Sequence, residues 1–92
     1  MNRVVHHYAV TDTPTRHMVP GGSKIVTALM RQGQPAVYVE KPAGEEVSPP
    51  EVPMMIVVVG TGQEFTAWGL HHIASLNDGA LVWHVYGSIN HG

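Results

Sequence analysis

One apolar run constrains this chain more than any other: Pro53-Met54-Met55-Ile56-Val57-Val58-Val59, which is closed by Gly60-Thr61-Gly62. The run is too short for a helix of ordinary length, is rich in β-branched residues and is bounded by proline and glycine. It therefore predicts a strand that is buried on both faces. Segment 80–86 is its expected partner, so the rest of the chain should supply shorter, half-buried strands around this pair.

Five further segments have the alternation or the flanking turn residues of strands: 4–10, 15–19, 24–32, 36–40 and 71–76. Segment 24–32 also fits one side of a helix, through Ile25, Ala28 and Leu29. We favour a strand because Gln32-Gly33-Gln34-Pro35 is typical of a hairpin loop leading to 36–40. Asn77-Asp78-Gly79 predicts a second hairpin, before segment 80–86. Segment 63–70 stays open between an irregular turn, a strand and one helical turn.

Six to seven short strands with at most one short helical turn indicate an all-β fold. We expect a small antiparallel sandwich or open barrel, formed as a single domain over residues 1–92. The proline-rich stretch 41–52 predicts a mobile surface loop, and 87–92 a frayed tail. Either face of the last strand could be buried, and we expect the first of the two sets Leu81, Trp83 and Val85, or Val82, His84 and Tyr86.

The composition excludes several classes of function. Only 13% of the 92 residues are charged, and the five Lys and Arg residues form no cluster, which argues against a nucleic-acid partner. A weakly charged surface favours self-association or a protein interface, so we expect a homo-oligomer. Without cysteine there is no disulfide framework and no thiolate metal site. No signal peptide and no membrane-spanning run is evident, so we expect a cytoplasmic protein and no membrane partner.

Seven histidines raise the question of a metal or proton-transfer site. Neighbouring residues of a strand point to opposite faces, so neither His6 with His7 nor His71 with His72 can bind one ion. A site would need one histidine from each of several strands, for example from the set His6, His17, His72 and His84. Most of the histidines are better explained as surface residues or cross-strand partners, and we expect no metal.

Gly60-Thr61-Gly62 follows a strand as a phosphate-binding loop would, but it lacks the third glycine, the lysine and the surrounding βαβ unit of the known motifs. A turn that needs positive φ is the better interpretation. Ser23 and Ser75 lack a nucleophile elbow, so we assign no catalytic residue and no cofactor, and expect no enzymatic activity. Aromatic residues and histidines on the strands are core or cross-strand residues unless exposed. The candidates for an interface are Tyr38, Trp68, His72, His84 and Tyr86.

The chain also resembles a known family. The shared segments are Val59-Gly60-Thr61-Gly62, His72-Ile73-Ala74-Ser75, and Gly79 to Tyr86 with its Leu-Val-Trp-His-Val-Tyr, together with His6 to Val10 and Val19 to Ile25. They resemble small uncharacterised proteins of tailed phages and prophages, which end in Gly-Thr-Gly, a Tyr-Ile-Gly-Thr strand and Leu-Val-Trp-His-Val-Phe. This chain departs from the pattern at His72, at Ala74 and in its proline-rich loop. The resemblance implies a phage product working in the host cytoplasm, and transfers no catalytic residue.

We therefore expect a small non-enzymatic protein that binds and blocks a host or defence macromolecule, with a host or phage protein as its partner. The alternatives are a protein that sequesters a small nucleotide-like ligand, and a structural or assembly component of the virion. A hydrolase that uses the histidines ranks last.

Overall fold

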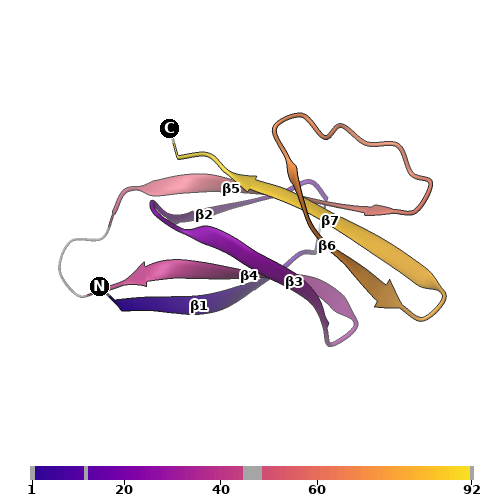
Figure 1. Ribbon diagram of the computed structural model, residues 1–92, viewed down its shortest axis with the longest axis horizontal. Helices are drawn as coiled ribbons and strands as arrows, with labels where there is room; N and C mark the ends of the chain where they lie inside the picture. The colour runs from indigo at the N-terminus through magenta and orange to yellow at the C-terminus, as the bar shows by residue number, and fades with distance from the viewer. Residues whose placement is uncertain (1, 12, 45–48, 92) are drawn as a thin grey trace.

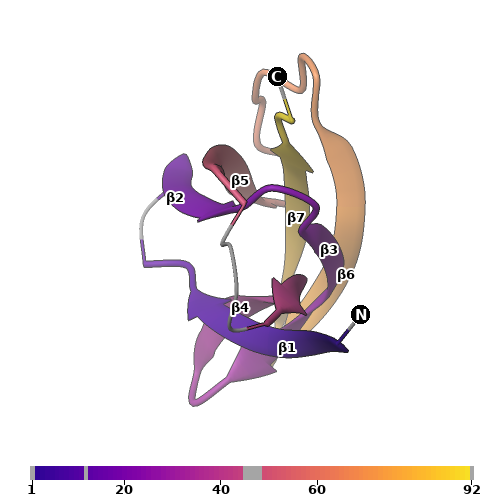
Figure 2. The same cartoon turned by 90° about the vertical axis from the view of Figure 1, so that its left-hand side faces the viewer.

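Two antiparallel sheets pack face to face around a shared apolar core (Figures 1 and 2). The computed structural model describes residues 2–11, 13–44 and 49–91, and within them the chain is all-β, as the sequence predicts. No helix that could span a membrane occurs in these residues. The strands in chain order are β1 (Asn2–Ala9), β2 (Thr15–Pro20), β3 (Lys24–Arg31), β4 (Gln34–Ala43), β5 (Glu51–Gly60), β6 (His71–Asp78) and β7 (Leu81–Ile89).

One sheet has the order β1-β4-β3 and the other the order β2-β5-β7-β6. The antiparallel pairing of β5 with β7 confirms the expected central pair. Segment 24–31 is a strand paired antiparallel with β4, and not a helix. Its hairpin turns at Gln32 and Gly33, which both have positive φ, the conformation that a two-residue hairpin loop requires. At one side of the sandwich, β3 packs against β6 and β7 and joins the two sheets.

The core is built where the two sheets face each other. Its fully buried aliphatic side chains are Val19, Val37, Val39, Met54, Ile56 and Val85. On β7, Val85 lies in this core and Trp83 packs against it, as expected, but Leu81 is 55% exposed. Leu81 pairs with Asp78 at the end of the β6–β7 hairpin, where the other sheet no longer covers it. The prediction for the buried face of β7 is thus right for two residues and wrong for the third.

The predicted boundaries of the loop at 41–52 are wrong at both ends, because the neighbouring strands extend into it. β4 continues to Ala43, paired with β1 down to Asn2, and β5 already begins at Glu51. Pro42 is tolerated inside β4 because the pairing with β3 ends at Glu40, so no neighbour needs a hydrogen bond from position 42 on that side. The predicted mobility of this loop concerns mainly residues 45–48, which lie outside the described residues.

The predicted frayed tail 87–92 is wrong from Gly87 to Ile89. These residues continue β7 and pair with β5, and the Asn90 N–H donates to the Pro53 carbonyl at 3.0 Å. Gly87 lies opposite Ile56 and is buried. A Cβ at this position would stand 2.7 Å from Ile56 Cδ1 and 3.1 Å from Ile25 Cδ1. The glycine that resembles a chain end in the sequence is therefore a point of close packing between the sheets.

We predict that Gly87→Ala destabilises the protein by about 1–3 kcal/mol, because the added methyl group overpacks a core that cannot move aside freely. Gly60→Ala is the matched control: it lies in the neighbouring strand, and its Cβ would meet nothing closer than Trp83 at 3.6 Å. Urea unfolding of both variants and the wild type measures the difference. Equal losses of free energy in the two variants would show that the sheets do not approach closely at Gly87.

Candidate functional site

The outer face of the four-stranded sheet is only partly covered. Along β5, core residues alternate with Pro53, Met55 and Val57, which point to the opposite face and are half-buried. The prediction that β5 is buried on both faces is wrong for these residues, because the second sheet covers only one side of the strand. Segment 61–70, which joins β5 to β6, crosses part of the outer face (Figure 1).

Segment 61–70 is irregular and is anchored at its start and in its middle. At its start Gly62 has a φ of 87°, the Gln63 N–H donates to the Gly60 carbonyl, and the Gly60 N–H donates to Gln63 Oε1 at 3.0 Å. This confirms the turn interpretation of Gly60-Thr61-Gly62. In its middle, the Phe65 ring lies 4.7 Å from the Tyr86 ring on β7. The segment therefore holds a defined position over the sheet.

A chain of polar contacts links β6, β7 and the start of this segment. Ser75 Oγ lies 2.8 Å from His84 Nδ1 and 3.0 Å from His72 Nε2, and the other nitrogen of His84 lies 2.9 Å from Thr61 Oγ1. The His72 ring also meets Tyr86 edge-on at 5.3 Å. A hydroxyl donates once and accepts as well, so Ser75 can bond both imidazoles in their neutral forms. We call Thr61, His72, Ser75 and His84 the histidine cluster.

The histidine cluster resembles a nucleophile beside a base, but its geometry favours a structural role. Ser75 is shared by two rings, and His84 uses its second nitrogen on Thr61. The group that orients His84 is the Thr61 hydroxyl, and no carboxylate among the described residues bonds either ring, so no acidic partner would stabilise an imidazolium as in a Ser-His-Asp triad. The cluster ties the segment to the sheet.

The described residues contain no group of three or more side chains placed to bind a metal ion. The four histidines that could have formed a metal site from separate strands do not lie together. His72 and His84 come together on the outer face, whereas His17 packs against the Tyr8 ring at 5.1 Å, between β1 and β2. His6 lies on β1, opposite Val39.

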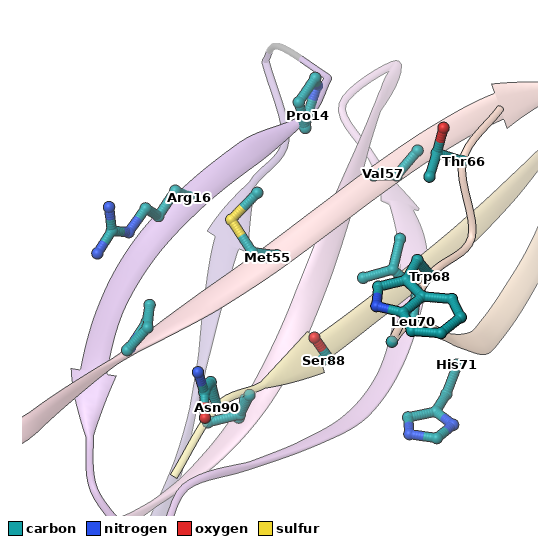
Figure 3. A pocket seen from close by; sticks show the side chains of 13 residues that line it. Pro14, Arg16, Met55, Val57, Thr66, Trp68, Leu70, His71, Ser88 and Asn90 are labelled. Carbon is teal, nitrogen blue, oxygen red and sulfur yellow. The ribbon is translucent and has the colours of Figure 1, made fainter. Parts of the chain in front are cut away.

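Beside the histidine cluster, the outer face is hollowed into a groove of about 860 Å³ that is open to solvent (Figure 3). Met55 and Val57 of β5 form its floor. Figure 3 shows Trp68, Leu70 and His71 on one side and Pro14 and Arg16 on the other. Pro53, Thr66, Gly69, Ser88, Ile89 and Asn90 complete the lining. Trp68 is 93% exposed, although most of its neighbours in the groove are apolar.

The five interface candidates from the sequence do not form one site. His72, His84 and Tyr86 come together on the outer face, and Trp68 lies on the groove beside them. Tyr38 lies in the other sheet, 5.9 Å from the His7 ring. Thr61, Phe65 and Ser75 also lie on this face and are not among the interface candidates from the sequence. Ser75 could have been found, because the hairpin after Asn77-Asp78 sets a register in which Ser75 faces His84.

Fold and outer face together define a small antiparallel β-sandwich protein with one partly uncovered sheet. A family model described as a domain of unknown function (DUF7352) matches residues 1–91, and the chain belongs to this family. The expected membership of an uncharacterised family across nearly the whole chain is thus confirmed, while the phage setting stays a prediction. No curated protein and no solved structure matches the chain.

We predict that Ser75→Ala lowers the free energy of unfolding by about 0.5–1 kcal/mol, because both imidazoles lose a partner at an exposed position. The ring resonances of His72 and His84 should shift together in NMR spectra. Ser88→Ala is the control: Ser88 lies on the same face, and its hydroxyl makes no hydrogen bond to the described residues. Unchanged His72 and His84 resonances in Ser75→Ala would contradict the cluster.

Proposed function

We propose that this is a non-enzymatic binding protein, which docks a segment of another protein in the groove on the outer face. The observation that carries the proposal is Trp68, held fully in solvent at the wall of an apolar groove. An apolar indole exposed to water costs free energy that a polar side chain at the same position would not cost. Tryptophan is also among the side chains most enriched at interface hot spots. Its position is defined, because Phe65 and the turn at Gly62 anchor the segment that carries it.

The shape of the groove favours a protein segment over a small molecule. Small-molecule sites enclose most of their ligand. This groove is open to solvent and draws its lining from β2, β5, β6, β7 and segment 61–70. Such a surface suits an extended segment that places one or two apolar side chains against Met55, Val57 and Trp68.

The charge of the residues that line the groove indicates which side chains a bound segment should carry. Arg16 is the one charged residue among the described residues that line the groove. A guanidinium at the wall of an apolar surface favours a carboxylate on the bound segment, where the pair is partly desolvated. We therefore infer an apolar segment with an acidic residue. The resemblance to phage proteins supports a host or defence protein as the owner of that segment, which this protein would block.

We predict that peptides selected from a displayed random library against the wild-type protein are apolar and carry an acidic residue. Trp68→Ala should weaken the binding of these peptides by about 30-fold or more, which is the loss typical of a hot-spot residue. Arg16→Glu should weaken acidic peptides selectively. Both residues are exposed, so neither change should alter unfolding by urea.

Leu81→Ala is the matched control, since Leu81 is an exposed apolar residue that does not line the groove. Peptides that bind Trp68→Ala and the wild type equally would contradict the proposed site. Native mass spectrometry of the purified protein tests the small-ligand alternative: a bound nucleotide-like mass, lost in Trp68→Ala, would replace the protein partner with a small molecule stacked on the indole.

A further inference from the structure

The described strands present four sheet edges, and three of them are blocked against further pairing. β3 and β6 pack against each other where the two sheets meet, and each has a register shift next to a neighbouring strand. β2 is short, follows Pro14, carries Arg16 and ends at Pro20. Mutual cover, bulges, prolines and charges are the devices by which natural sheets prevent association at their edges.

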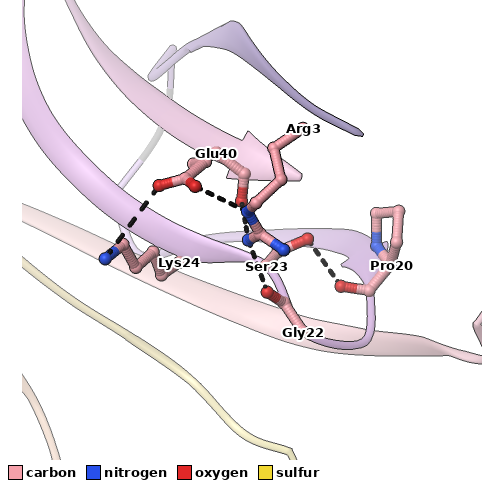
Figure 4. A network of polar contacts seen from close by, with 6 residues as sticks. All are labelled: Arg3, Pro20, Gly22, Ser23, Lys24 and Glu40. Carbon is pink, nitrogen blue, oxygen red and sulfur yellow. Dashed lines mark hydrogen bonds and ion pairs between the residues drawn. The ribbon is translucent and has the colours of Figure 1, made fainter. Parts of the chain in front are cut away.

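The fourth edge, β1, has none of these devices. It is eight residues long, contains no proline and pairs with β4 over its whole length without a register shift. Its one charged residue, Arg3, turns away onto the sheet, where it forms an ion pair with Glu40 and donates to the Gly22 carbonyl at 2.8 Å (Figure 4). A long edge strand without charges in the way is a template for another strand.

The hydrogen-bond pattern shows which residues of β1 face the open edge. The Val10 N–H donates to the Pro35 carbonyl at 2.9 Å, which makes this the hydrogen-bonded type of antiparallel pair. Such pairs alternate with non-bonded ones, so Tyr8, His6 and Val4 also bond β4. The amide and carbonyl groups of the alternate residues, Arg3, Val5, His7 and Ala9, therefore point out of the sheet.

We propose that this open edge of β1 pairs antiparallel with β1 of a second copy of the chain, around a two-fold axis at His6. This register brings Arg3 opposite Ala9 and Val5 opposite His7, so that all four outward-facing residues have partners and no like charges meet. An axis at Val5 would instead set Arg3 against His7 and would place Ala9 opposite position 1, beyond the described part of β1. The two three-stranded sheets become one continuous sheet across the dimer.

The dimer is independent of the proposed docking groove. No residue of β1 lines the groove, which lies on the outer face of the other sheet. Both grooves of the dimer stay open, so the pair would present two copies of the binding face. Loss of the dimer would leave peptide binding by a single chain intact, and loss of peptide binding would leave the dimer intact.

A cysteine at the axis tests the register. The chain has no cysteine, so His6→Cys introduces a single thiol. At the axis the two copies of residue 6 form a non-bonded pair with Cα atoms about 4.5 Å apart, within reach of a disulfide. We predict that mild oxidation converts most of His6→Cys to a covalent dimer. Val26→Cys, on β3 and 51% exposed in the wild type, should stay largely monomeric on a non-reducing gel. Equal cross-linking of the two variants would overturn the proposal.

Val5→Pro tests the hydrogen bonds of the edge. Its amide points outward, so proline removes no bond within the chain but blocks the second copy. We expect the wild type and the control Val5→Thr to sediment as dimers and Val5→Pro as a monomer, with the far-ultraviolet circular dichroism of the wild type retained. A monomeric wild type, or a Val5→Pro variant that still dimerises, would overturn the proposal. Should proline unfold the chain, the cross-linking of His6→Cys decides alone.

Discussion

The absent side chain of Gly87 lets the two sheets meet. Ile56 lies directly across the ladder from Gly87, and its Cδ1, with that of Ile25 from the opposing sheet, occupies the space where a Cβ would stand. A chain of this size buries a smaller fraction of its surface than a large domain does, so each close contact between sheets contributes a large share of the stability. The position of β3 against β6 and β7, and with it the closed side of the sandwich, depends on this contact.

The strands were predictable because they rest on local chemistry. β-Branched runs, alternation and the turn residues at Gln32-Gly33 and Asn77-Asp78-Gly79 specify strands and hairpins without knowledge of tertiary contacts. The ends of the strands were not predictable in the same way. Pro42 and Gly87 are residues that usually end strands, and each is tolerated here for a tertiary reason: an unpaired side of β4 for the proline, and crowding by Ile25 and Ile56 for the glycine.

In the candidate site too, contacts set by local register could be predicted from the sequence, whereas contacts set by tertiary packing could not. The contact of Ser75 with His84 follows from hairpin register and could have been derived from the sequence. The packing of Phe65 on Tyr86 could not, because segment 61–70 has no periodicity and its fold-back is decided by the face it covers. The expectation that β5 is buried on both faces failed for an informative reason. The second face of the strand is covered at Val59 but only half-covered at Met55 and Val57, which leaves these two residues as the floor of a groove.

Three features of this protein favour association with other chains: its low charge, the open edge of β1 and the half-covered apolar face of the four-stranded sheet. A protein with 13% charged residues repels its neighbours weakly. Arg16 lies on the edge strand β2, and Lys24 and Arg31 lie at the ends of β3, whereas the one charged residue of β1, Arg3, is paired with Glu40 on the neighbouring strand. An edge recognises another strand through backbone groups, whereas a groove recognises side chains. The two surfaces can therefore bind different partners without competing. A small sandwich that pairs through β1 gains buried surface that its own core cannot supply, while the outer face of its other sheet stays open to a second protein.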